Sequence, residues 1–185
     1  MSKVFAALAV SVDGRITGGN PRPGSGLGDG GTLFDWYGDP RNAAVYDQLL
    51  DRVGAVVTGR TTYDDSEGFG GGSPHPTAPM VVLSHRPQPA EHAGSPRQVF
   101  AASVQDAIGQ ARALAGGRDV AIQGGATLTA AIGAGLVDEV VLHQVPVLLG
   151  AGRPLFGRLP EHVRLTLVDT VPGAGVVHLH YRIDR

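Results

Sequence analysis

The segment 123–127, QGGAT, combines the residue types that a turn around a phosphate group requires. It follows a short apolar run at 120–122 and precedes a stretch typical of a helix. Two adjacent glycines let the backbone approach a ligand closely, and the start of a helix offers free N–H groups to an anion. The segment predicts one wall of a nucleotide site, although a glycine pair before a helix is by itself a common turn.

Three more polar turns follow apolar runs: SVDGRI at 11–16, TGRTT at 58–62 and SHR at 84–86. In α/β sheets, ligands bind at the carboxyl ends of the parallel strands, which lie at one edge. We therefore expect the four turns to lie together. Arg60 and Arg86 would add charge-assisted contacts to phosphate, whereas an arginine taken singly is more often a solvated surface residue.

The elements that position these turns alternate between strand and helix. The run at 4–10 is continuously apolar, which is typical of a central strand buried on both faces. Asp39-Pro40 resembles a helix N-cap followed by proline at the first helical position. Ser103 and Asp106 form a capping-box-like pattern at the start of another helix. These signals predict helices packed on a mostly parallel sheet.

The C-terminal part of the chain predicts a different kind of pairing. The runs 163–171 and 176–183 flank a Pro-Gly-Ala-Gly turn, which indicates an antiparallel β-hairpin. We therefore expect one α/β domain over residues 1–185. It would be a three-layer α/β/α fold whose mostly parallel central sheet ends in an antiparallel C-terminal hairpin.

Composition excludes several classes of function. A formal net charge of −2, with charged residues at 17%, argues against broad electrostatic binding to nucleic acid or to an anionic membrane. The absence of cysteine excludes disulfides and thiolate metal sites. No apolar run reaches the ~18 residues of a membrane span, and the first strand starts too early for a signal peptide. We expect a cytoplasmic protein with a small-molecule substrate and neither a nucleic-acid nor a membrane partner.

Four segments carry a resemblance to a known family: FAALAVSVDGRI, VVTGRTTYD, VVLSHRP and IQGGATL. They occur in the order seen in the dihydrofolate reductase-like superfamily, which the chain resembles over residues 3–156 and in the terminal hairpin. The start SVDGRI and the segment LVDEVVLHQVPVLLGAGRPLF look more like the C-terminal reductase domain of bifunctional riboflavin biosynthesis proteins and its stand-alone relatives. The junctions are specific for the superfamily and much less specific for the substrate.

The resemblance implies NADPH as the cofactor and a cis peptide at the glycine pair. The implied cofactor-binding residues contact the nicotinamide carboxamide (Ala7 and Ile16), a phosphate (Gly59, Arg60, Thr61 and Thr62), the adenosine 2′-phosphate (Ser84, His85 and Arg86) and the pyrophosphate (Gln123, Gly124, Gly125, Ala126, Thr127 and Leu128).

The catalytic residues depart from those of dihydrofolate reductases, which place a carboxylate one turn into the first helix. That position falls at about Asn42 or Ala43, so folate is disfavoured as a substrate. Asp13, beside the expected nicotinamide, is the better polar candidate for catalysis, and its alternative role is to fix an Asp-Gly turn. The candidate substrate-binding residues are Trp36, Tyr37, Asp39 and Gln144, together with the loop 148–153.

Histidine spacing does not predict a metal site. Only His178 and His180 share a strand face, and we expect them at the surface or edge rather than as ligands. His143 and Gln144 alternate along one strand, so one of them points inward and packs in the core. The apolar runs 140–149 and 163–171 could form a homodimer interface or belong to the core.

The predicted function is an NADPH-dependent reductase that transfers a hydride to a small heterocyclic or carbonyl/imine substrate. In this chemistry the cofactor carries the hydride, and the protein orients both reactants. Reduction of a ribosylamino-pyrimidine in riboflavin synthesis is the closest enzymatic alternative, although loop 18–38 does not match the ribose-phosphate site of those enzymes. Dihydrofolate reductase activity is a second alternative. A non-catalytic NADPH-binding sensor is an alternative of a different class.

Overall fold

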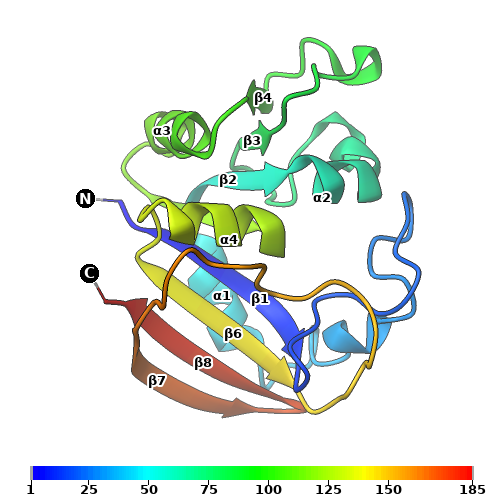
Figure 1. The fold of residues 1–185 in the computed structure, drawn as a ribbon, viewed down its shortest axis with the longest axis vertical. Coiled ribbons are helices and arrows are strands. Elements are labelled where there is room, and N and C mark those ends of the chain that lie inside the picture. The colour runs from blue at the N-terminus through cyan, green and yellow to red at the C-terminus, as the bar shows by residue number, and fades with distance from the viewer. Residues whose placement is uncertain (1, 185) are drawn as a thin grey trace.

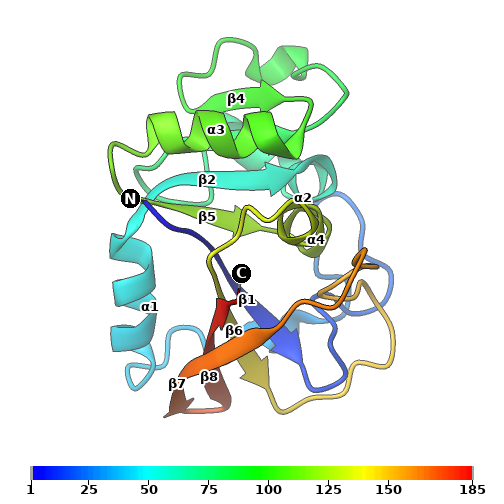
Figure 2. The same cartoon turned by 60° about the vertical axis from the view of Figure 1, so that its left-hand side comes forward.

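One eight-stranded sheet forms the centre of the computed structural model, which describes residues 2–184. The strand order is β4-β3-β2-β5-β1-β6-β8-β7 (Figure 1; β5 is labelled in Figure 2). The strands are β1 (Val4–Ser11), β2 (Val53–Gly59), β3 (Met80–Leu83), β4 (Gln98–Ala101), β5 (Asp119–Gln123), β6 (Glu139–Val145), β7 (Leu165–Gly173) and β8 (Val176–Ile183). The first six run parallel, whereas β8 is antiparallel to both β6 and β7. The mostly parallel sheet and its antiparallel hairpin are therefore confirmed.

Helices cover both faces of the sheet, as a three-layer fold requires. Helices α3 (Val104–Leu114) and α4 (Gly125–Gly133) lie on one face and α1 (Ala43–Asp51) on the other (Figures 1 and 2). Side chains alternate along β1: Val4 and Ala6 join the core on the α3 and α4 side, whereas Phe5 packs with Val56 and Leu49 on the α1 side. The uninterrupted apolar run is thus explained by burial on both faces.

The two predicted helix starts have different outcomes. Ser103 caps α3 as expected, because its Oγ accepts a hydrogen bond from the N–H of Asp106 at 3.1 Å. The expected start at Asp39-Pro40 is wrong, since α1 begins at Ala43. The Asp39 carboxylate instead accepts hydrogen bonds from the backbone and the guanidinium of Arg41. A local turn therefore replaces the first helical turn.

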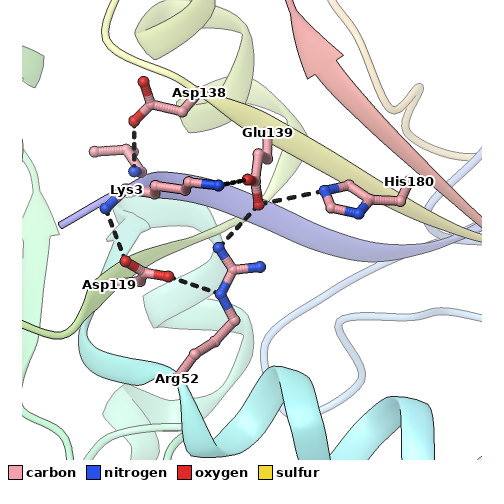
Figure 3. A network of polar contacts seen from close by, with 7 residues as sticks. Lys3, Arg52, Asp119, Asp138, Glu139 and His180 are labelled. Atoms are coloured by element: carbon pink, nitrogen blue, oxygen red, sulfur yellow. Dashed lines mark hydrogen bonds and ion pairs between the residues drawn. The ribbon is translucent and has the colours of Figure 1, made fainter. Parts of the chain in front are cut away.

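An ion-pair network joins the amino ends of β1, β5 and β6 (Figure 3). The Glu139 carboxylate, in a residue only 5% exposed, binds the Lys3 ammonium and lies 2.8 Å from Arg52 Nη2 and 3.3 Å from His180 Nε2. Asp119 accepts from Arg52 Nε at 2.7 Å and from the Lys3 N–H at 2.7 Å. Burial raises the pKa of Glu139, but the hydrogen bonds from Lys3 and Arg52 outweigh it and hold that pKa at about 2.

Among residues 2–184, none of the helices combines the length and the apolar character that a membrane crossing requires.

Candidate functional site

The turn between β5 and α4 brings the backbone unusually close to its neighbours. Gly124 has φ 92° and ψ 135°, and a Cβ there would lie 2.6 Å from Thr62 Oγ1. A Cβ on Gly125 would collide with the carbonyl oxygen of Leu155. Both positions therefore require glycine. The peptide bonds of the described residues are all trans, so the cis peptide expected at this pair is wrong.

A cavity of about 570 Å³ opens beside this turn at the carboxyl edge of the sheet. Its volume is in the range typical of small-molecule sites. It collects residues from the turns after β1, β2 and β5 and from the loops around 26–34 and 153–157. Seven predicted cofactor residues line it: Ile16, Thr61, Thr62, Gln123, Gly124, Gly125 and Ala126.

A smaller hollow of about 210 Å³ continues the cavity across the glycine turn. The two share Thr61, Thr62, Gly124 and Ala126, so they form one groove. The far part is bordered by the predicted residues Gly59, Arg60 and Thr127 and also by Leu83. A Cβ on Gly59 would lie 2.5 Å from Thr127 Oγ1, which shows how closely the end of β2 approaches the first turn of α4. The groove therefore involves three of the four predicted turns, 11–16, 58–62 and 123–127.

Two arginines converge on one carboxylate beyond this hollow. Arg60, in α2 (Arg60–Asp65), places Nε 2.6 Å from Asp64 Oδ1, and Arg86 places Nη2 2.6 Å from Asp64 Oδ2. Burial raises the pKa of Asp64, but the hydrogen bonds from Arg60 and Arg86 outweigh it and leave the pKa below its usual value. Ser84 Oγ accepts from the N–H of Arg86, and His85 is exposed. With two cations for one anion, this corner keeps an excess positive charge.

Five of the predicted cofactor residues do not line the groove: Ser84, His85, Arg86, Leu128 and Ala7. Leu128 is fully buried in the core, and its N–H donates to the carbonyl of Gly124. Ala7 lies on the α1 side of the sheet, where it lines a separate cavity. The side chain of Leu128 therefore cannot contact a ligand in the groove.

The separate cavity, of about 320 Å³, lies between α1 and the sheet, and we call it the apolar cavity. It shares Phe34 and Gln123 with the larger cavity, so the two adjoin. The residues that line it are Phe5, Ala7, Phe34, Tyr37, Tyr46, Leu49, Leu50, Val53, Val56, Pro74, His75, Ala121, Ile122 and Gln123. Tyr37 was a predicted substrate residue, whereas Phe34 was missed. The aromatic run 34–37 was the available signal, but it does not indicate which ring points inward.

Trp36 does not face either of these cavities. It is 4% exposed, its Nε1 donates to the carbonyl of Leu33 at 2.9 Å, and its ring packs against His143 and His178. Together with Asp39 it borders a surface hollow of about 230 Å³ beside α1. The structure therefore does not bring Trp36 together with the groove, because its ring anchors the loop to the sheet.

The Asp13 carboxylate is bound within the protein by hydrogen bonds to its own turn and to the loop after β6. Its Oδ1 accepts from Ser11 Oγ at 2.6 Å and from the Leu149 N–H at 3.0 Å, and its Oδ2 accepts from the Gly150 N–H at 2.8 Å. These bonds, that of Ser11 first, lower the pKa of Asp13 to about 2. The residue lines none of the three cavities. This geometry supports the alternative of a turn anchor, and the catalytic role of Asp13 stays a prediction.

The opposite wall of the larger cavity comes from the loop after β6 rather than from β6 itself. Gln144, on β6 between β1 and β8, lines neither of these cavities, so the structure does not bring it together with the other predicted residues. Arg153 does line the larger cavity, and its guanidinium pairs with Asp65, whose side chain is 9% exposed. The sequence analysis missed Asp65, because its partner is far away in the chain.

His143 is buried, as expected for one of the pair His143 and Gln144, whereas His178 is more buried than expected. His178 is 3% exposed and His143 is 5% exposed, and their Nδ1 atoms lie 2.7 Å apart. The surface position predicted for His178 is therefore wrong. Burial, followed by the neighbouring His178, lowers the pKa of His143 to about 4. His180 belongs to the Glu139 network (Figure 3). Within residues 2–184, no group of three or more His, Asp or Glu side chains is arranged to hold a metal ion.

Comparison with known protein families identifies the family of the chain. The model of the RibD C-terminal domain matches residues 2–179 of the chain. The chain belongs to the RibD C-terminal domain family. In Bacillus subtilis (strain 168), the uncharacterized protein YwjB is 26% identical over 184 residues, 97% of each chain. The match to the uncharacterized protein YyaP of the same organism is local, with 43% identity over 67 residues, 35% of this chain and 36% of YyaP.

Solved structures agree with this membership of the RibD C-terminal domain family. A candidate riboflavin biosynthesis protein from Shewanella sp. PV-4 has a TM-score of 0.76 at 26% identity, with both chains fully covered. Dihydrofolate reductase from Enterococcus faecalis, in complex with NADP(H) and RAB-propyl, has a TM-score of 0.66 at 18% identity, and the match covers 99% of this chain and 97% of that one. The predicted dihydrofolate reductase-like fold and the predicted family are therefore confirmed, and together they support a reductase.

Proposed function

We propose that the protein is an NADPH-dependent reductase that transfers a hydride to a small heterocyclic or carbonyl/imine substrate. The observation that carries the proposal is the pair of adjoining spaces at one sheet edge. One is a groove that crosses a glycine turn towards two arginines, and the other is an apolar cavity that meets the groove at Phe34 and Gln123. A reductase needs such an arrangement, because the cofactor and the substrate must meet with their reacting atoms close together.

The residues that line and border the groove suit the phosphate groups of a dinucleotide. A side chain at Gly124 or Gly125 would collide with Thr62 or Leu155, so glycines are needed for the tight turn before α4, whose first N–H groups would bind the pyrophosphate. Arg60 and Arg86 would bind the 2′-phosphate, which distinguishes NADPH from NADH. When bound, the cofactor supplies the hydride. The protein orients the nicotinamide, excludes water from the apolar cavity and leaves the substrate in contact with Phe34 and Gln123.

The proton that accompanies the hydride has no obvious side-chain donor. Asn42, at the position where the resemblance implies a carboxylate, is 2% exposed and its amide binds the carbonyls of Trp36 and Ala174. The apolar cavity is lined by neither aspartate nor glutamate. This arrangement disfavours folate and favours protonation by a tyrosine of the cavity, Tyr37 or Tyr46. It is also the observation that favours the alternative of an NADPH-binding sensor.

Turnover assays separate these candidates. The protein is mixed with NADPH and with dihydrofolate, a ribosylamino-pyrimidine or small cyclic imines and carbonyl compounds in turn, and the loss of NADPH absorbance is followed. Consumption with one of the small heterocyclic or carbonyl/imine compounds supports the reductase. Binding of NADPH without any consumption would favour the sensor, and the absence of NADPH binding would contradict both.

We also propose that two copies of the chain associate through β7. This strand is at the edge of the sheet, so its outer hydrogen-bonding groups have no neighbouring strand (Figure 1). Leu165, Leu167 and Val168 on this strand are 41%, 54% and 53% exposed. Light scattering after gel filtration should give a dimer mass, and Leu167→Lys should give a monomer. A monomeric wild-type protein would contradict the proposal.

A further inference from the structure

Two buried side chains anchor the segment 31–40 to the rest of the protein. Within this segment Leu33 and Trp36 are buried, and the other residues are exposed or half-buried. Trp36 Nε1 donates to the Leu33 carbonyl at 2.9 Å, so the two anchors are joined to each other. Phe34 and Tyr37, on either side of Trp36, are exposed and line the apolar cavity. The position of this cavity wall therefore depends on what holds Trp36.

A pair of histidines forms the surface against which Trp36 packs. The centroid of the Trp36 ring lies 4.7 Å from that of His143 on β6 and 5.3 Å from that of His178 on β8. The two imidazoles lie opposite one another in the antiparallel pairing of these strands, with their Nδ1 atoms 2.7 Å apart. One Nδ1 must therefore carry a hydrogen and the other a lone pair. A neutral pair satisfies both atoms, whereas two protonated rings would direct two hydrogens at each other.

The surroundings of the pair do not favour a positive charge on either ring. The charged and titratable groups that border the hollows beside Trp36 and His178, or join them, are Tyr37 and Asp39 from the loop, Tyr46, Asp47 and Arg52 from α1, Glu139 from β6, Asp169 from β7 and His180 from β8, and β1 contributes none. Arg52 is bound to Glu139, and the hydrogen bond of His143 is to His178. Burial, followed by the neighbouring His178, lowers the pKa of His143 to about 4, and burial lowers the pKa of His178.

We propose that His143 and His178 form an acid-sensitive latch on Trp36. Near neutral pH the uncharged pair packs against the indole ring. An added proton turns the pair into a buried cation, which water stabilises far better than the sheet does, so the histidines and Trp36 separate. Phe34 and Tyr37 then lose their fixed place at the apolar cavity. The latch stands without the proposed function, and only its effect on substrate binding rests on that function.

The difference in proton binding between the two states sets the sign and the size of the effect. In the released state the pKa of His143 returns to the ordinary 6.5, against about 4 in the latched state. The released state therefore binds more protons between these values, so the latch has its full strength above pH 6.5 and weakens as the pH falls towards 4. For His143 alone, the equilibrium constant for release rises about twentyfold from pH 7 to pH 5. His178 adds to this effect, because its pKa is lowered as well.

Trp36 is the only tryptophan of the chain, so its fluorescence reports on the latch directly. The full chain is titrated from pH 7 to pH 4 without nucleotide. We expect the emission maximum to move to longer wavelengths and acrylamide quenching to increase, while far-UV circular dichroism stays constant. Wavelength and acrylamide access are followed because a protonated histidine can dim a neighbouring indole without moving it. An emission maximum that stays constant until the circular dichroism is lost would overturn the proposal.

Two glutamine variants assign the transition to the pair. His143→Gln keeps a hydrogen-bonding side chain that does not titrate, so the emission shift should disappear or move to lower pH. His162→Gln replaces an exposed histidine and should titrate like the wild type. An unchanged transition in His143→Gln would contradict the assignment, and the wild-type titration remains decisive if this variant does not fold. Because the titration needs no nucleotide, a failure to bind NADPH would contradict the proposed function and leave the latch intact.

Discussion

The two ends of the same parallel strands satisfy their polar groups in opposite ways. At the amino ends, Glu139 and Asp119 bind Lys3 and Arg52, and cations and anions match one another (Figure 3). At the carboxyl ends, two arginines share Asp64 and the amide of Gln123 has no partner. Matched groups stabilise the fold, whereas unmatched groups keep binding capacity for a ligand. One sheet thus separates stability from function along its strands.

The largest effect should come from breaking the amino-end network. Glu139→Gln removes the buried negative charge that Arg52 and Lys3 share, so the free energy of unfolding should fall by about 3 kcal/mol in urea titrations. The affinity for NADPH should stay within about twofold, because the groove is at the other end of the strands. A large loss of NADPH affinity in a folded variant would show that the two ends are not independent.

Gly124→Ala should disrupt the binding groove at the carboxyl ends of the strands. A Cβ would lie 2.6 Å from Thr62 Oγ1 at a φ of 92°, so the turn must shift, and we expect NADPH to bind about a hundredfold more weakly. Gly109→Ala in α3 is the matched control, because nothing lies within 4 Å of that position. If both variants bind NADPH like the wild type in fluorescence titrations, the glycine turn is not part of the site.

Lowering the pH should reduce stability first at His143 and only at lower pH at the ion-pair network of Glu139. The folded pKa of His143 is about 4, below the ordinary 6.5, so the unfolded chain binds more protons between these values. The stability contribution is complete above pH 6.5 and is lost as the pH falls towards 4. We expect unfolding free energy to drop by about 2 kcal/mol from pH 7 to pH 5.

His143→Leu should flatten this dependence, as measured by urea unfolding at both pH values. Over the same interval Glu139 should contribute little, because its pKa falls from 4.5 to about 2 on folding and its stabilisation is lost only below pH 4.5. An unchanged pH dependence in His143→Leu would show that another group titrates.

Arg60→Ala sharpens the comparison at the far end of the groove. Loss of a charge-assisted contact to the 2′-phosphate should weaken NADPH about tenfold or more and NADH much less. Arg112→Ala, an exposed arginine in the last turn of α3, serves as the control. An equal loss for both nucleotides would place Arg60 away from the 2′-phosphate.

The smallest effect on activity is expected for Asp13→Asn. Asp13 anchors Leu149 and Gly150 and lines no cavity, so kcat should change by less than about twofold while the melting temperature falls. A loss of kcat with unchanged stability would restore Asp13 as a catalytic residue.

Sequence patterns predicted those parts of the molecule that depend on local chemistry. Continuous apolar runs identified the central strands, and the glycine turn after β5 could be located because neighbouring residues along the chain form it. Because β2, β5 and β1 are parallel neighbours in the sheet, three of the four predicted turns lie around one groove. These features follow from periodicity and turn composition.

Long-range partners account for the errors. Trp36 was expected at the substrate, but its partners His143 and His178 are more than a hundred residues away in sequence. Asp39 was expected to cap a helix, but Arg41 competes for its carboxylate. Asp65, the last residue of α2, lines the larger cavity beside its distant partner Arg153, and the path of the segment that carries Phe34 depends on tertiary contacts.

The central claim is that the groove at the carboxyl ends binds NADPH. Parallel fluorescence titrations of the wild-type protein with NADPH and NADH test it most directly. We predict saturable binding of NADPH in the micromolar range, at least about tenfold tighter than that of NADH, because two arginines lie beyond the glycine turn. The absence of saturable NADPH binding up to about 1 mM would contradict the claim.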